Sequence, residues 1–299
     1  MVVSGVTRPA SMAAATVTTL LTEPGSVNKV VTVAAAIEAG LVTPDTVMAV
    51  PDSLQVGDHQ FTDSHPHPTT SWSVTDILAT SSNVGTIMLA RQLGGERMDD
   101  FLRRFGFGEP TGLDFPAESA GIMLPAEEWD RQSTAIGAIP IGQGVSVTAL
   151  QMLQAFNVLA NDGTYVPARL VREVTGPDGS PEEIENGDPR QVVSPATAQA
   201  VRAMMAQVVS RGTGKLAAVP GYTVAGKTGT ARKPQPGGGY EDAAGQMHYI
   251  ATFAGLLPAE NPDLSIIVVI ERPGSGSSMT TMIDRSGFSA GSRPAKVAM

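Results

Sequence analysis

A serine and a lysine three positions apart, Ser26 and Lys29, form the first pattern with catalytic potential. They stand where Pro24-Gly25 and a run of small and apolar residues up to Gly40 predict a helix. Residues three apart share one helix face, so the Lys29 amine can lie beside the Ser26 hydroxyl. A desolvated lysine with a lowered pKa can take the serine proton and create a nucleophile. The pattern is also common by chance, as a capping serine followed by an exposed lysine.

Two further motifs carry groups that could complete such a site. Ser81-Ser82-Asn83 lies between two predicted helical stretches and offers a hydroxyl for proton relay and an amide for a substrate carbonyl. Lys227-Thr228-Gly229-Thr230 lies in a predicted strand, where the glycine permits close approach of another backbone. Its cation and hydroxyls suit an anionic peptide end, and a peptide along the strand edge would add main-chain hydrogen bonds. Each motif alone could be an ordinary cap, loop or strand. The three in this order match the known catalytic signature S-x-x-K, S-D-N and K-T-G, with Ser-Ser-Asn in place of S-D-N.

The elements that must position these motifs follow from the periodicity of apolar residues and from turn residues. A glycine after the last apolar residue ends the first helix at Gly40, and Ser194-Pro195 opens the last one. We expect helices over residues 26–40, 74–79, 85–93, 98–104, 147–161 and 195–209, and strand-like runs over 164–175, 221–231, 248–258 and 264–272. Helices first and strands last favour an α+β domain with helices packed on an antiparallel sheet.

Two regions without periodicity are expected at the surface. Residues 42–72 are rich in Pro, Asp, Ser, Thr and His and predict an extended surface excursion, while 176–189 predict a polar hairpin or loop. His65-Pro66-His67, with His59 and Asp63 nearby, supplies metal-ligand types but no spacing that places them on one face. We therefore expect a surface loop there and no metal.

Composition excludes several classes of function. The chain has 299 residues with 42% hydrophobic and 16% charged residues, which fits a globular core. A net charge of −9 argues against a nucleic-acid partner, because phosphate binding needs a basic patch. The lack of cysteine excludes disulfides, thiolate zinc sites and a cysteine nucleophile. No apolar run is long enough to span a membrane, and the first residues make a poor signal peptide.

Five separated blocks around and between these motifs carry a resemblance to a known family. The blocks are EPGSVNKVVTVAAAIE, HPHPTTSWSVTDILATSSNVGTIMLARQLG, GQGVSVTALQMLQAFNVLANDGTYVPARLV, VAGKTGTARKP and YIATFAGLLPAENPDLSIIVVIERP. They resemble the transpeptidase domain of class B penicillin-binding proteins, of the septal, cell-division type with an actinobacterial character. The resemblance spans residues 22–273. It implies a penicillin-binding protein/serine β-lactamase-like α+β fold, with an antiparallel sheet flanked by helices and a mainly helical lobe.

The resemblance implies a serine D,D-transpeptidase that cross-links peptidoglycan. Ser26 would attack the penultimate D-alanine carbonyl of a stem peptide, expel the terminal D-alanine and form an acyl-enzyme that an amino group of a second strand attacks. Lys29 would be the base for acylation, Ser81 would relay the proton to the leaving amine, and Asn83 would orient the substrate amide. β-Lactams would acylate Ser26 as mimics of the D-Ala-D-Ala end.

The resemblance also assigns substrate-binding groups and partners. Lys227, as a catalytic residue, would tune the electrostatics of the site and, with Thr228, hold the substrate carboxylate. Thr228, Gly229 and Thr230 are the implied substrate-binding residues of this strand. The backbone N–H groups of Ser26 and Thr230 would form the oxyanion hole. Stem peptides, β-lactams and cell-division proteins are the implied partners, no cofactor is implied, and the implied location is the extracytoplasmic face of the cell membrane.

Three further expectations concern the ends of the chain and competing functions. Residues 1–21 are an atypical N-terminal segment and 274–299 a polar tail, so we expect a domain shortened at both ends, without its anchor. One rival function is a D,D-carboxypeptidase or β-lactamase of the same fold, for which Glu127 and Glu128 are the only candidate residues to position a water. The other rival is a non-catalytic binding or scaffold module.

Overall fold

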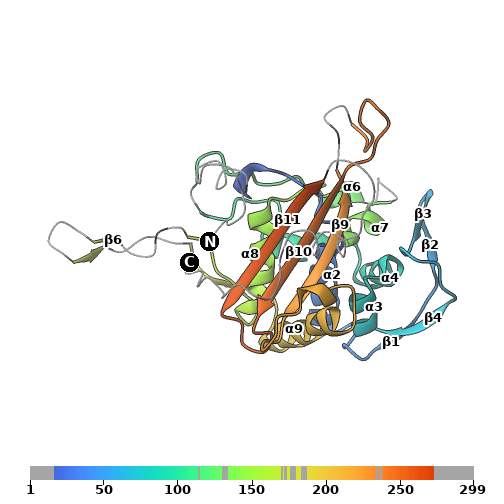
Figure 1. Cartoon of the computed structure of the whole chain (residues 1–299), viewed down its shortest axis with the longest axis horizontal. Coiled ribbons are helices and arrows are strands. Elements are labelled where there is room, and N and C mark those ends of the chain that lie inside the picture. The colour runs from blue at the N-terminus through green and yellow to red at the C-terminus, as the bar shows by residue number, and fades with distance from the viewer. Residues whose placement is uncertain are drawn as a thin grey trace.

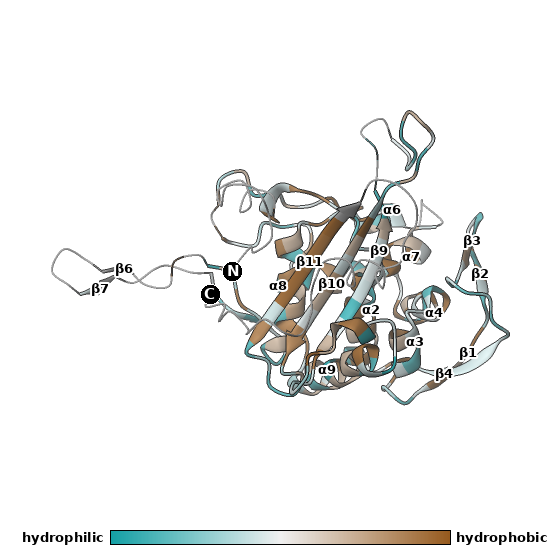
Figure 2. Cartoon of the chain, viewed as in Figure 1, coloured by the Kyte–Doolittle hydropathy of each residue, from teal (hydrophilic) through white to brown (hydrophobic). Residues whose placement is uncertain are grey.

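The computed structural model describes residues 17–113, 115–129, 134–169, 171, 174–175, 180–182, 187–233, 235 and 238–272. Its centre is an antiparallel sheet of three strands, in the order β11-β10-β9. The strands are β9 (Ala225–Arg232), β10 (Tyr249–Leu257) and β11 (Leu264–Arg272). The predicted antiparallel meander of the last third of the chain is confirmed. Figure 2 shows β10 and β11 as largely apolar strands and β9 as a more polar one, because β9 carries the Lys-Thr-Gly-Thr motif at the edge of the sheet.

Helices cover one face of this sheet (Figure 1). Helix α8 (Ala149–Ala160) packs against β10 and β11, and α9 (Pro195–Ser210) packs against β9. Between them and the remaining helices runs α2 (Lys29–Glu38), whose first eight residues are all buried. A helix buried on all sides belongs in the core of a domain. The predicted α+β class, with helices packed on an antiparallel sheet, is confirmed.

A mainly helical part lies beside the β9 edge (Figure 1). Its helices are α3 (Val74–Thr80), α4 (Asn83–Leu93), α5 (Gly95–Arg104), α6 (Ala126–Trp129) and α7 (Ala135–Ala138), with the 3₁₀ turn η2 (Ile139–Ile141). Their apolar side chains join those of α2, α8 and α9 in one core. Two further 3₁₀ turns are η1 (Gly25–Asn28) and η3 (Lys215–Ala217).

The segment 42–72 is more ordered than the sequence predicted. It forms two antiparallel ribbons, in which β1 (Val47–Val50) pairs with β4 (Thr70–Ser73) and β2 (Ser53–Val56) pairs with β3 (His59–Thr62). These strands are four residues long, and each buries only part of its side chains. Such short strands leave little alternation in the sequence, which is why composition indicated only an extended surface segment.

The single strand predicted over 164–175 is wrong. Instead β5 (Thr164–Tyr165) pairs with β8 (Arg190–Gln191), and β6 (Val174–Thr175) pairs with β7 (Pro181–Glu182). Pro167 lies just after β5 and lacks the N–H that a continuing ladder needs. The polar hairpin predicted for 176–189 contains β7, while residues 274–299 lie outside the described part of the chain.

Among the described helices, none combines the length and the apolar character that crossing a bilayer requires.

Candidate active site

Ser26 lies in the 3₁₀ turn η1, immediately before helix α2. Gly25, at φ +57°, turns the chain into η1, and its N–H donates to Gly142 O at 2.9 Å. In a 3₁₀ turn the side chains at i and i+3 eclipse, so Lys29 follows Ser26 on the same face. Ser26 is half-buried, whereas Lys29 is fully buried.

The Lys29 amine has its hydrogen-bond partners on another element. Its Nζ donates to Ser81 O at 2.5 Å and to Asn83 Oδ1 at 2.6 Å, and lies 3.2 Å from Ser81 Oγ. Among the described residues, no hydrogen bond reaches the Ser26 hydroxyl. Burial lowers the pKa of Lys29 to about 7, although the negative charge of Asp63 opposes this effect. Near neutral pH a substantial fraction of the Lys29 amine is therefore unprotonated.

Ser81 is held in a strained conformation at the junction of α3 and α4. It ends α3 in the left-handed region, at φ 63°, which costs a non-glycine residue about 1–2 kcal/mol. This conformation brings both its carbonyl and its hydroxyl to Lys29. Ser82 then caps α4 by accepting from Gly85 N–H at 2.9 Å. Strain of this kind persists where the surroundings over-determine it, commonly at functional sites.

Asn83 is the first residue of α4, whereas the sequence predicted a helix only from Gly85. Its side-chain amide is oriented from both ends, since Nδ2 donates to Thr62 O at 2.8 Å while Oδ1 accepts from Lys29. Thr62 is the last residue of β3, so the ribbon β2–β3 takes part in holding the site.

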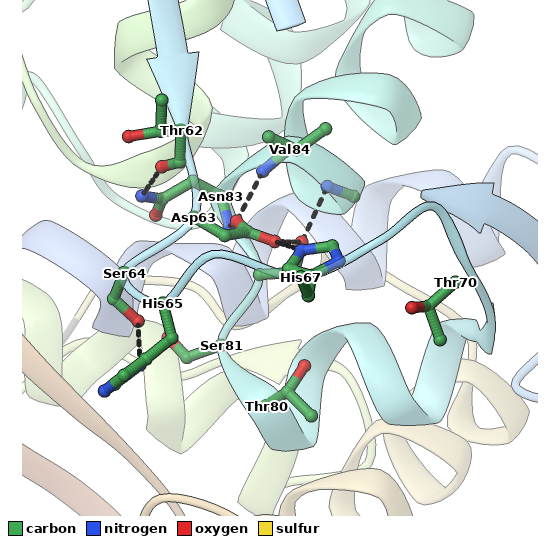
Figure 3. Close-up of polar contacts among 12 residues, drawn as sticks. Thr62, Asp63, Ser64, His65, His67, Thr70, Thr80, Ser81, Asn83 and Val84 are labelled. Atoms are coloured by element: carbon green, nitrogen blue, oxygen red, sulfur yellow. Dashed lines mark hydrogen bonds and ion pairs between the residues drawn. The ribbon is translucent and has the colours of Figure 1, made fainter. Parts of the chain in front are cut away.

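Asp63 directly supports the start of α4, as Figure 3 shows. One oxygen of its carboxylate accepts from the N–H groups of Asn83 (2.5 Å) and Val84 (3.0 Å), and the other accepts from Ser82 Oγ (2.7 Å) and faces His67 Nε2 (3.0 Å). An anion at a helix N-terminus satisfies free N–H groups and complements the helix dipole. Asp63 thus fixes the backbone on which Asn83 and Ser81 depend.

The strand motif reaches the same point from the sheet. Lys227, on β9, is fully buried, and its Nζ donates to Ser81 Oγ at 2.8 Å and to Thr228 O at 3.0 Å. Burial lowers the pKa of Lys227 well below its ordinary value, and the neighbouring Lys29 charge lowers it further. The Ser81 hydroxyl therefore lies between two buried amines. Two ammonium groups so close in a low dielectric repel each other, which favours the loss of one proton.

Glycine allows β9 to approach η1. A Cβ at Gly229 would stand 3.1 Å from Pro24 O and 3.3 Å from Val27 N, tighter than ordinary contacts. A Cβ at Gly25 would stand 3.2 Å from Thr230 O. The backbones around Ser26 and Thr230 are thus in contact, as expected for a glycine at a close backbone approach. Along β9, Thr230 is exposed, while Thr228 is buried with its Oγ1 2.7 Å from Thr213 Oγ1.

Glu23 and Tyr240 flank the serine turn from the other side. The Glu23 carboxylate accepts from Gly144 N–H at 2.8 Å and from the Tyr240 hydroxyl at 3.2 Å. Its burial raises the pKa of Glu23, and these two hydrogen bonds oppose that rise. The contact ties the connection between β9 and β10 to the residue three positions before Ser26.

The structure brings the three motifs together around Ser81. It adds Asp63, Thr213, Glu23 and Tyr240, which the sequence did not single out as site residues. From the sequence, Asp63 is only a residue of a metal-ligand type near His65-Pro66-His67. The described residues contain no group of three side chains that could hold a metal ion. Nothing local predicts the contacts of Asp63 with Ser82, Asn83 and Val84, since they cross 19 to 21 positions. A cavity of about 740 Å³ lies between α8 and the start of β11, and none of the motif residues lines it.

Comparison with known proteins agrees with this geometry. Residues 6–285 match the family model of the penicillin binding protein transpeptidase domain. Penicillin-binding protein PbpB of Mycobacterium tuberculosis is 44% identical over 264 residues, which cover 85% of this chain and 38% of that protein. A probable peptidoglycan D,D-transpeptidase, PbpC of Pseudomonas aeruginosa, is 35% identical over 253 residues, covering 84% of this chain and 41% of that protein. The chain thus spans about two fifths of the length of these relatives.

A solved structure gives the same result for the fold. Penicillin binding protein 3 of Mycobacterium tuberculosis, complexed with ampicillin, superposes with a TM-score of 0.83 at 41% identity, covering 90% of this chain and 62% of that chain. The resemblance of the sequence to the transpeptidase domain of penicillin-binding proteins is therefore confirmed. This chain belongs to the penicillin-binding protein transpeptidase domain family.

Proposed function

We propose that this chain is a serine D,D-transpeptidase domain that forms an acyl-enzyme at Ser26 with peptides ending in D-Ala-D-Ala. The observation that carries the proposal is the convergence of two buried lysine amines on the Ser81 hydroxyl, beside the turn that holds Ser26. The relatives named as penicillin-binding proteins and peptidoglycan D,D-transpeptidases support the reaction class.

Acylation would begin with proton transfer from Ser26 to an unprotonated Lys29. A neutral amine has two N–H groups for Ser81 O and Asn83 Oδ1 and one lone pair to accept a proton. Ser26 Oγ then bonds to the penultimate D-alanine carbonyl carbon. The oxyanion is held by the N–H groups of Ser26 and Thr230, at the close approach of η1 and β9.

Expulsion of the terminal D-alanine needs a proton on its amine. Ser81 would deliver this proton, because its hydroxyl lies between Lys29 and Lys227 and can pass a proton from one side while receiving one from the other. Asn83 would orient the substrate amide. Attack by an amine of a second peptide forms the cross-link and releases Ser26.

The D-alanine carboxylate would bind along β9. Thr230 is exposed there, and Thr228 offers a hydroxyl paired with Thr213. Because β9 is an edge strand of the sheet, a strand-like peptide could pair with it. An arriving carboxylate would favour the charged form of Lys227 and so offset the cost of burying that amine.

The same proposal covers the biological setting. The natural partners would be peptidoglycan stem peptides and, by analogy with the ampicillin complex of a relative, β-lactams. Cell-division proteins are proposed partners because the sequence blocks resemble the septal, cell-division type of this family. The extracytoplasmic face of the membrane is the proposed location.

A peptide assay tests the reaction against its rivals. The protein is incubated with a D-Ala-D-Ala peptide, with and without an acceptor amine, and free D-alanine and the aminolysis product are quantified. In the wild type we expect release of D-alanine and, with the acceptor amine present, aminolysis as the main fate of the acyl group. In Ser26→Ala we expect neither product. Water as the dominant acceptor would point to a carboxypeptidase, whereas no release by a folded wild type would favour the binding module. Glu127, one of the two candidate residues for the hydrolase, is exposed on α6, where its charge acts on Arg103.

A further inference from the structure

His67 is an ion-paired histidine just outside the catalytic motifs. Its Nε2 lies 3.0 Å from Asp63 Oδ2, and its Nδ1 lies 2.7 Å from the carbonyl oxygen of Pro68. The ring packs on Trp72 of β4, with the ring centroids 4.7 Å apart, and the side chain is 15% exposed. Figure 3 shows His67 beside the Asp63 carboxylate, opposite the backbone of α4.

These contacts indicate which protonation state the structure requires. A carbonyl oxygen and a carboxylate oxygen only accept hydrogen bonds, so both ring nitrogens must carry a hydrogen for both contacts to form. Only the imidazolium cation satisfies this condition. The hydrogen bond to Pro68 O, the bond to Asp63 and the charges of Asp63 and Asp52 accordingly raise the pKa of His67.

The partner of His67 acts on two parts of the catalytic site. Asp63 anchors the N–H groups of Asn83 and Val84 and the Ser82 hydroxyl, and its negative charge raises the pKa of Lys29. A cation on the far side of Asp63 therefore has two consequences. It keeps the carboxylate in place against α4, and it reduces the field that would keep Lys29 protonated.

We propose that His67 is a positioning residue for acyl transfer, which acts through Asp63 to hold the Ser81–Asn83 segment against Lys29 and to keep the Lys29 amine available as a base. This inference rests on the proposed function of the site. It assigns a role to the ribbon connection 63–69, which links β3 to β4 and contains none of the three motifs.

The test compares two histidine variants two positions apart. His67→Gln keeps one donor to Asp63 but removes the positive charge and the contact to Pro68. His65→Gln is the matched control, because His65 is exposed and its ring bonds only to Ser64 among the described residues. The second-order rate constant of acylation by a fluorescent penicillin is measured from pH 5.5 to 9.5, together with the thermal unfolding midpoint of each protein.

We expect His67→Gln to move the rising limb of the pH profile to higher pH, because Asp63 then acts on Lys29 without a compensating cation. At pH 7 the rate constant should fall about tenfold, within the roughly hundredfold loss that a misplaced group can cause. His65→Gln should keep the wild-type profile.

Two outcomes would overturn the proposal. An unchanged rate constant and pH profile in His67→Gln would show that the site does not depend on the cation. A lower rate at every pH with an unshifted profile would assign His67 a merely structural role, and the unfolding midpoint would fall in parallel. A wild type that is folded but never acylated would instead refute the proposed function itself, and with it this role.

Discussion

At the scale of single residues, the site contains two buried amines, those of Lys29 and Lys227. Burial disfavours the charged form of each, so the two are not expected to carry a proton at the same time. Lys29 and Lys227 lie within hydrogen-bond distance of the same hydroxyl, and burial lowers the pKa of each. Water would normally stabilise both charges, but neither side chain is exposed. Desolvation thus leaves part of the Lys29 amine unprotonated near neutral pH, and the proposed mechanism uses this amine as its base.

The rate of acylation should depend on pH through the Lys29 amine. Lys29 has a pKa of about 7, so it carries a proton below that pH and cannot accept the Ser26 proton. The acylation rate constant should rise with pH, by about tenfold per pH unit well below 7, and level off above it. Stopped-flow measurement with a chromogenic β-lactam from pH 5 to 9 checks this. A profile that is flat through this range, or that falls as pH rises, would remove Lys29 as the base.

At the scale of elements, the site depends on two junctions: the capped turn between α3 and α4, and the close approach of β9 to η1. Each junction combines a local signal with a contact that is remote in sequence. Ser82 caps α4 locally, but its hydroxyl also donates a hydrogen bond to Asp63, the residue that follows β3. Gly229 is an ordinary strand glycine until η1 packs against it.

Ser82→Ala should weaken both functions of this cap. The loss of an N-cap side chain typically costs about 1 kcal/mol of stability, and here Asp63 also loses a donor. We expect slower acylation beyond what the lower stability explains. Ser73→Ala is the control, because Ser73 caps α3 at its other end, through a capping box with Asp76. The free energy of unfolding in urea and the acylation rate are measured for both variants. Equal acylation rates in Ser82→Ala and Ser73→Ala would show that Ser82 affects the site no more than an ordinary helix cap does.

Gly229→Ala should separate β9 from the serine turn. Its Cβ would meet backbone atoms of Pro24 and Val27, which cannot rotate away as a side chain would. We expect a marked fall in acylation with a loss of stability of about 1–3 kcal/mol, the usual range for overpacking. Gly95→Ala is the control, because its Cβ would stand 3.3 Å from the Trp129 ring, a similarly close contact at the start of α5, outside the three motifs. This variant should keep the wild-type acylation rate. Normal acylation of Gly229→Ala would mean that the close approach is unnecessary.

The same distinction explains what could be predicted from the sequence. Helices α2, α8 and α9 and the β9–β11 meander follow from apolar periodicity and from local caps, and they form where expected. The pairing of β1 with β4 and the bonds of Asp63 to Ser82, Asn83 and Val84 join residues about twenty positions apart, for which periodicity carries no signal. For the same reason, spacing placed Lys29 beside Ser26 but did not predict that its hydrogen bonds go to Ser81 and Asn83.

At the scale of the whole molecule, the site lies where the edge of the sheet meets the helical part of the chain (Figure 1). Ser26 comes from the turn before the central helix, Ser81 and Asn83 from the helical part, and Lys227 from the sheet. None of these elements alone contains a functional set of groups. Catalytic competence should therefore depend on the packing of the whole core, and acylation should be lost together with the global fold.

The assignment of Ser26 as the nucleophile is tested by the intact mass of the folded protein after exposure to benzylpenicillin, followed by peptide mapping of the adduct. We expect one covalent adduct per chain, located on Ser26, and no adduct on Ser26→Ala with an unchanged unfolding midpoint. A folded wild type without an adduct, or an adduct on any other residue, would contradict this assignment.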